Sequence, residues 1–259
     1  MIGAADLCAG LTNWRISYLM GLGEIRRRYS RSRLGQFWMT VSTGVLVAAV
    51  GVVWSVLWKV RISELMPFIA ISQILWTLIS GAIGEAPTAF VSAGPIFLNQ
   101  GMSFSTAIYA LVFRHFLVFL HNLPIAILTV VAFPVPFGIV SLLAIPGIVL
   151  VLLSLVWSTY AIAIICVRFR DLTQVVQSAL LIAFFVTPIF WKPSQFPPDA
   201  QYFLALNPFA DLLSVVRDPM MGDIPGPAEW VGALVFAIGG FVLTLPLIGL
   251  SQRRIIFWI

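Results

Sequence analysis

The sequence predicts an all-α integral membrane protein with six transmembrane helices, preceded by an amphipathic interfacial helix, with both termini in the cytoplasm. Of its 259 residues, 60% are hydrophobic and only 10% are charged. A soluble domain carries roughly 25% charged residues, so this chain has too much apolar surface to hide from water. Its net charge of +5 follows the expected topology and forms no separate basic stripe, which argues against a nucleic-acid-binding domain.

Six apolar runs are candidates for the membrane spans. Crossing about 30 Å of hydrocarbon takes roughly 20 helical residues. The runs that reach or approach this length are about 37–58, 66–85, 107–131, 138–166, 175–191 and 230–250. The turn FPVPFG joins the third and fourth runs into a hairpin, and we expect a kink at Pro146–Gly147 and a bend at Pro188.

Basic residues set the orientation of these spans. With both termini in the cytoplasm, the inside segments hold ten Lys and Arg residues and the outside segments hold four. This asymmetry agrees with the positive-inside rule. It predicts a multi-pass protein of the bacterial inner membrane.

The chain divides into a cytoplasmic segment, 1–36, and a transmembrane domain, 37–259. Within the domain, 86–102 is a cytoplasmic connection, and 192–229 is the longest outside loop, with short re-entrant helices, one of them in ALNPFADLLSVVRD. The first segment carries apolar residues at steps of three or four, as an interfacial amphipathic helix requires. These residues are Leu11, Trp14, Tyr18, Leu22, Ile25 and Tyr29.

The residues give no sign of catalysis. The ten acidic residues are scattered, and no two are adjacent or separated by one residue. Neither lysine, Lys59 or Lys192, stands in a phosphate-binding G-x-x-x-x-G-K-[ST] loop. Cys8 and Cys166 have no metal-ligand spacing and are expected to be reduced thiols. The chain is therefore not expected to be an enzyme, and any ATP that drives it is hydrolysed by another chain.

Four stretches resemble one family of transport proteins: RRRYSRSRLGQFW at 26–38, AFVSAGPIFLNQ at 89–100, VRFRDLTQVVQSALLIAFFVTPIFW at 167–191 and LNPFADLLSVVRDPMMG at 206–222. In this order they resemble the membrane subunits of ABC polysaccharide exporters of the type-two permease family, which export O-antigen, capsule or teichoic acid. The resemblance implies a homodimer with two ATPase subunits that hold ATP and Mg²⁺, and no cofactor in this chain. It also implies a polyprenyl-diphosphate-linked glycan as substrate.

Three interpretations apply to the arginine-rich segment before the first span. Its positive charge holds the N-terminus inside, attracts anionic lipids, or recognises a substrate diphosphate, for which arginine forks are suited. The third gains support from the resemblance, which puts substrate entry near this Leu-Gly loop. Its candidate residues are Arg26, Arg27, Arg28, Arg31, Arg33 and Gly35.

Two cytoplasmic segments are candidates for contact with the ATPase. The resemblance implies a coupling helix in 86–102, with Phe90, Pro95, Phe97 and Leu98 as candidate anchors. Arg170 and Asp171, between the fourth and fifth spans, form the second segment. Helix capping by Asp171 is an equally good interpretation.

Arg114 is the one charged residue well inside a span. A charge at that depth is costly and is a candidate functional group. It could contact substrate, but a snorkelling side chain or a pair with Glu85 is the favoured interpretation. His121 and Asn122, two turns further on, are expected to hydrogen-bond between helices.

Aromatic residues on the first and fifth spans could line a path for a glycan, although most aromatics of the chain are expected to face lipid. The candidates are Trp38, Trp54, Phe184, Phe185 and Trp191, with the polar Gln174 and Gln177 on one helix face. Two other functions stay open: an ABC exporter of a small molecule or drug, and an ion-coupled carrier built on Arg114, His115, His121 and Glu85.

Overall fold

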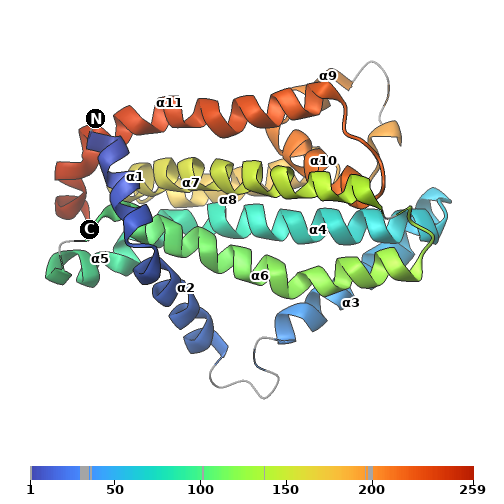
Figure 1. Ribbon diagram of the computed structural model, residues 1–259, viewed down its shortest axis with the longest axis horizontal. Coiled ribbons are helices and arrows are strands. Elements are labelled where there is room, and N and C mark those ends of the chain that lie inside the picture. The colour runs from blue at the N-terminus through green and yellow to red at the C-terminus, as the bar shows by residue number, and fades with distance from the viewer. Residues whose placement is uncertain are drawn as a thin grey trace.

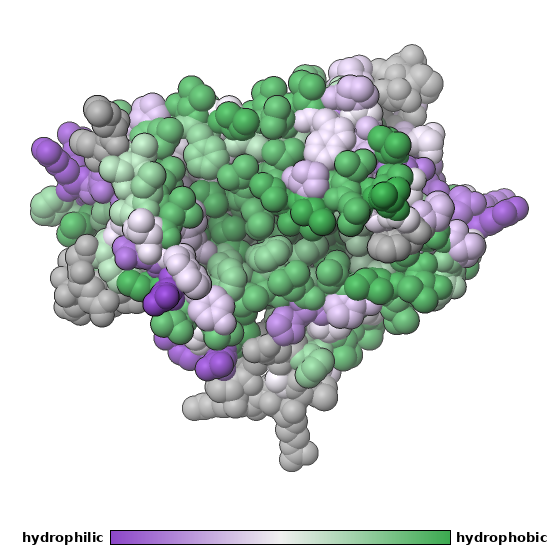
Figure 2. Space-filling view, in the orientation of Figure 1, coloured by the Kyte–Doolittle hydropathy of each residue, from purple (hydrophilic) through white to green (hydrophobic). Residues whose placement is uncertain are grey.

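The computed structural model describes residues 2–29, 35, 37–100, 102–136, 138–195, 197 and 201–259, and the regular structure in these ranges is entirely helical. Long helices lie side by side in one bundle, and both termini lie at the same end of it (Figure 1). The face toward the viewer is mostly hydrophobic, with hydrophilic residues gathered toward its ends (Figure 2). The all-α membrane fold predicted from composition is confirmed at this level.

Five helical segments in the described ranges are long and apolar enough to cross a membrane. They contain α3 (Phe37–Trp58), α4 (Ile62–Glu85), α6 (Phe104–Ala132), α7 (Ala144–Arg168) and α11 (Pro227–Trp258). The remaining predicted run coincides with α8 (Leu172–Val186), an apolar helix of 15 residues. It ends because Thr187 precedes Pro188 and adopts extended backbone. A sixth span stays a prediction.

Helix α4 occupies the centre of the bundle. The structure buries 83% of its most apolar window, against 11% for α3. Ile71, Ile74 and Leu75 on α4 belong to the main buried cluster. Helix α3 instead presents apolar side chains outward over most of its length, as a helix against lipid does.

The predicted short helix in the outer loop is confirmed as α10 (Pro208–Met220). The Asn207 side chain caps it by accepting a 3.0 Å hydrogen bond from the Phe209 amide. Leu212, Leu213, Val215 and Val216 are each at most 1% exposed, which explains why the segment is too apolar for a free loop. It is followed by the beginning of α11, and the short α9 (Gln201–Ala205) precedes it.

Helices α7 and α10 approach closely at Gly147. A Cβ atom at Gly147 would overlap the Val215 carbonyl oxygen, so only glycine fits there. Pro146, where a kink was expected, does not interrupt α7. After the short 3₁₀ helix η2 (Ile139–Leu143), Pro146 lies in the first turn of α7, where its missing amide hydrogen costs no helical bond.

The N-terminal segment consists of two helices, α1 (Ile2–Thr12) and α2 (Trp14–Tyr29), which meet at Asn13. The single helix expected from the apolar spacing is therefore interrupted. Leu11, Trp14 and Tyr18 are exposed, whereas Ile25 is buried. A position in the membrane interface stays a prediction.

Asp6 holds α1 against the bundle. Its buried carboxylate accepts hydrogen bonds from the amides of Phe104 and Ser105, at 3.2 and 3.0 Å. It also accepts one from the Tyr160 hydroxyl at 2.8 Å and one from Gln252 Nε2 at 3.2 Å. One side chain thereby joins α1 to α6, α7 and α11.

Candidate functional site

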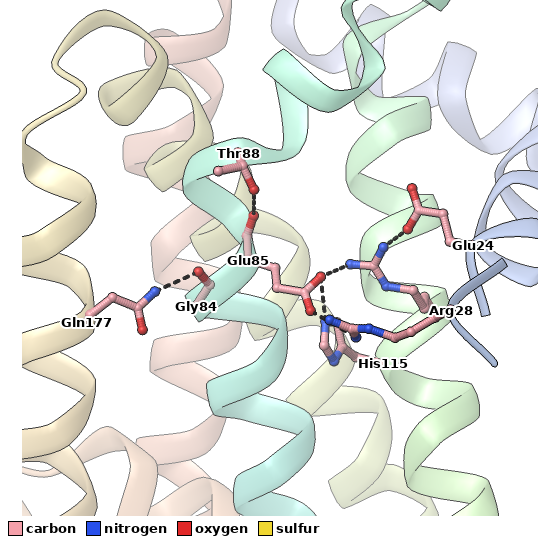
Figure 3. Close-up of polar contacts among 8 residues, drawn as sticks. Glu24, Arg28, Gly84, Glu85, Thr88, His115 and Gln177 are labelled. Atoms are coloured by element: carbon pink, nitrogen blue, oxygen red, sulfur yellow. Dashed lines mark hydrogen bonds and ion pairs between the residues drawn. The ribbon is translucent and has the colours of Figure 1, made fainter. Parts of the chain in front are cut away.

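A cluster of ionisable side chains joins α2, α4 and α6 (Figure 3). Arg114 of α6 forms ion pairs with both Glu24 of α2 and Glu85 of α4. Glu85 also lies 3.4 Å from Arg28 Nη1 and 3.6 Å from His115 Nε2. Glu85 is thus the common partner of three basic side chains.

Two carboxylates compensate the charge of Arg114, whose side chain is only 14% exposed. An isolated charge at this depth would be very costly, and opposite charges within contact distance offset that cost. The structure has the predicted pair of Arg114 with Glu85. Glu24 was missed, because only the packing of α2 on α6 brings it to Arg114.

Beside this cluster is a hollow of about 390 Å³ between α2, α6 and the segment that follows α4. Glu24, Arg27, Glu85 and Arg114 supply its charged lining, and small side chains of α5 (Ala89–Gln100) and α6 supply much of the rest. The hollow therefore connects the basic end of α2 with the beginning of the predicted coupling element.

Arg26, Arg27 and Arg28 form the last turn of α2 and are exposed. Positive charge at the C-terminal end of a helix is favourable because of the helix dipole. Gly35 has a φ of +55°, a backbone conformation that favours glycine. Arg31 and Arg33 lie outside the described residues.

The predicted coupling element forms a 3₁₀ turn, η1 (Ala86–Thr88), and α5. Phe90 and Phe97 are 0% and 6% exposed, with the Phe90 ring 5.6 Å from the rings of Phe104 and Tyr160. They pack inside this chain, which corrects their expected role as anchors in another protein. The side chains of Pro95 and Leu98 lie outside the described part of the structure.

The second predicted contact segment joins α7 and α8. Arg170 and Asp171 are both exposed there. Asp171 occupies the N-cap position of α8, but its side chain forms no capping hydrogen bond. The capping interpretation is therefore wrong, and a contact with a partner stays a prediction.

The structure brings some residues of the predicted glycan path together and separates others. Phe185 and Trp191 line a hollow of about 510 Å³ together with Trp58 and Gln195, which the sequence interpretation missed. Trp54 packs on Trp58, with ring centres 4.7 Å apart.

The other candidates for the path are not among the lining residues of this hollow, although the Phe184 ring lies 5.4 Å from that of Phe185. Phe184 packs on Trp76, with ring centres 5.9 Å apart. Trp38 is 55% exposed on α3. Gln174 is exposed, and Gln177 Nε2 donates a 2.8 Å hydrogen bond to the Gly84 carbonyl.

Another hollow, of about 740 Å³, lies against α10 and the beginning of α11. Its charged lining consists of Asp211, Asp218, Glu229 and the buried Arg217. Burial, with Glu229 nearby, raises the pKa of the Asp211 carboxyl to about 6. This site was missed, because these four charged residues form no recognisable sequence motif, although all lie within 211–229.

The helical bundle and its apolar, membrane-length helices define a multi-pass membrane protein. No family model matches the chain. It is 24% identical to an O-antigen export system permease protein RfbA of Klebsiella pneumoniae over 233 residues. The matched stretch covers 88% of this chain and 86% of that protein. An RfbA protein of Myxococcus xanthus is 23% identical over 194 residues, or 74% of each chain.

These similarities confirm the resemblance that the motifs predicted. Over most of its length the chain resembles proteins named as permeases of O-antigen export systems. Together with its apolar helices, this identifies a multi-pass protein of the inner membrane.

Proposed function

We propose that the chain is the transmembrane subunit of an ATP-driven exporter that moves a polyprenyl-diphosphate-linked polysaccharide outward across the inner membrane. The observation that carries this proposal is the similarity, along 88% of the chain, to a permease named for O-antigen export. The chain performs no chemistry itself. Two copies of it assemble with two ATPase subunits, which hold ATP and Mg²⁺.

In the proposed topology, six helices span the membrane and both termini are cytoplasmic. The position of both termini at one end of the bundle supports this topology (Figure 1), as does the excess of basic residues in the inside segments. Helices α1, α2 and α5 then lie at the cytoplasmic face, and α10 lies at the opposite end.

In this proposal the diphosphate of the substrate binds near the basic end of α2. Arg26, Arg27 and Arg28 are exposed there, and guanidinium groups form strong hydrogen bonds to phosphate oxygens. Arg31 and Arg33 continue the same basic segment along the sequence. The glycan follows the face that contains Phe185 and Trp191, where flat rings can stack on sugars.

Motion of the ATPase enters through η1 and α5 in this proposal. Glu85 directly precedes η1 and pairs with Arg114 and Arg28. These ion pairs therefore transmit movement of α5 to α2, which carries Arg26, Arg27 and Arg28. Val91 and Ser92 are exposed on α5 and replace Phe90 and Phe97 as candidate contacts with the ATPase.

An ATP-driven exporter of a small molecule shares this architecture and differs only in cargo. The ion-coupled carrier gains no support, because Arg114 and Glu85 are paired with each other. His121 does not join this cluster, because its Nδ1 lies 2.8 Å from the Leu117 carbonyl oxygen of its own helix.

The decisive experiment is purification of the chain with its native partners in nanodiscs, followed by measurement of the mass of the complex and its ATP hydrolysis. We expect two copies of this chain, two ATPase subunits, and hydrolysis that responds to lipid-linked glycan. Glycan should lose its effect when Arg27 and Arg28 are both changed to Gln, whereas Arg253→Gln should preserve it. A chain that purifies alone, with no ATPase after gentle solubilisation, would contradict the proposal.

A further inference from the structure

An apolar groove of about 320 Å³ lies where α1 meets α2, against α6 and α7. The interruption of the helix at Asn13 separates the two helices and opens this space. Leu11, Trp14 and Tyr18 line it from the N-terminal segment. Val112, Phe116 and Leu152 line it from the bundle.

The inner wall of the groove has few polar atoms to offer. Ser17 Oγ donates to the Thr106 carbonyl oxygen at 3.1 Å, and the Tyr109 hydroxyl donates to the Leu7 carbonyl oxygen at 3.2 Å. Both hydroxyls are thus engaged within the chain. The occupant of this wall must be apolar, because a polar group there would lose its hydrogen bonds to water.

The mouth of the groove is exposed and apolar. Leu11 and Trp14 are 58% and 59% exposed, and the middle of the face toward the viewer, beside α1 and α2, is mostly hydrophobic (Figure 2). Trp and Tyr side chains prefer the depth of the lipid headgroups. With α1 and α2 in their predicted interfacial position, the groove opens toward the acyl chains of the membrane.

A positive charge lies at the same mouth. The guanidinium carbon of Arg15 is 5.7 Å from the centre of the Trp14 ring, and the Arg15 side chain is exposed. A guanidinium beside an apolar groove complements a molecule that has one anionic end and a hydrocarbon tail.

We propose that this groove binds one acyl chain of an anionic phospholipid, with the lipid phosphate at Arg15. The bound lipid fills the space between α1, α2 and α6 and holds the junction of α1 and α2 against the bundle. The site is separate from the basic end of α2, and the proposal does not depend on which substrate is exported.

The test uses the full chain in nanodiscs that contain equal amounts of phosphatidylglycerol and phosphatidylcholine, released gently and analysed by native mass spectrometry. We expect the wild type to retain one phosphatidylglycerol per chain. Leu152→Trp, which fills the groove, should lower retention about tenfold. Leu153→Trp is the matched control on the adjacent exposed position, and it should retain the lipid.

A surface variant tests the headgroup without changing the packing. Arg15→Gln should reduce the preference for phosphatidylglycerol about fivefold, whereas Arg253→Gln, which removes the same charge elsewhere, should not. Equal retention by Leu152→Trp and Leu153→Trp would overturn the groove as the site. Equal retention of both lipids by the wild type, or preferential retention of added polyprenyl phosphate, would overturn an anionic phospholipid as its occupant.

Discussion

At the scale of single residues, ion pairs compensate the buried charge of Arg114. Arg114 contacts two carboxylates from two other helices. Such a pair contributes little net stability, because removing charges from water costs about as much as their attraction returns. Removing one partner is different, since the others then remain as uncompensated charges.

We therefore expect Arg114→Gln to destabilise the protein by about 3 kcal/mol, near the low end for breaking a buried ion pair. The measurement is denaturant-induced unfolding in detergent micelles. Arg254→Gln, which removes an exposed arginine of α11, is the matched control and should change stability little. Equal stability of both variants would show that the ion pairs are solvated.

Asp6 is the other residue on which several elements depend. Asp6→Ala leaves two backbone amides, a tyrosine hydroxyl and an amide side chain without their acceptor. We expect a loss of at least about 3 kcal/mol, since each buried donor without a partner costs roughly 1–3 kcal/mol. Limited proteolysis should then cleave α1 faster. Asp6→Asn retains one acceptor oxygen and should lose less stability. Identical proteolysis rates of the wild type and both variants would refute the role of Asp6 in holding α1 against the bundle.

At the scale of elements, the contact between α7 and α10 depends on one glycine. Gly147→Ala places a methyl group against the Val215 carbonyl and should cost about 1–3 kcal/mol through overpacking. The control is Gly239→Ala on α11, where a Cβ meets nothing within 4 Å. There alanine should be neutral or stabilise the helix, so equal thermal shifts of the two variants would contradict the close approach.

Helix α10 also carries the titrating group Asp211. Its folded-state pKa of about 6 exceeds the ordinary value of 3.8, so between these pH values the folded protein binds more protons than the unfolded chain. Its contribution to stability is therefore present in acid and is lost as the pH rises through 6.

Asp211→Asn should remove this pH dependence. We expect the variant to melt about 2 °C higher than the wild type near pH 7 and at nearly the same temperature near pH 4. The shift is small because the carboxyl is only half-buried. Thermal unfolding at both pH values gives the comparison. A variant that is stabilised equally at both would show that Asp211 is already ionised in acid.

At the scale of the whole molecule, the proposed topology makes the end of the bundle that holds both termini the cytoplasmic end. Cys8 is exposed on α1, at the end that holds both termini. A membrane-impermeant thiol reagent should therefore leave Cys8 unlabelled in intact cells and label it after lysis. A cysteine placed at the exposed Asp223, in the outer segment after α10, should be labelled in intact cells. The reverse pattern would invert the topology.

The sequence by itself determined the fold class, the main helices, the short helix at α10 and the resemblance to polysaccharide-export permeases. These depend on local composition, hydrophobic runs and turn residues, all of which a linear pattern records. Hydropathy could not divide the N-terminal segment at Asn13, because its apolar spacing continues across the break.

Only the tertiary structure decided which side chains meet. It placed Glu24 against Arg114, turned Phe90 and Phe97 into the interior, and gathered Asp6 with its donors from three distant helices. Periodicity gives the outward direction of a side chain on its own helix. The identity of the facing helix depends on close packing between segments about a hundred or more residues apart, such as Asp6 with Ser105 and Gln252, and no local pattern encodes it.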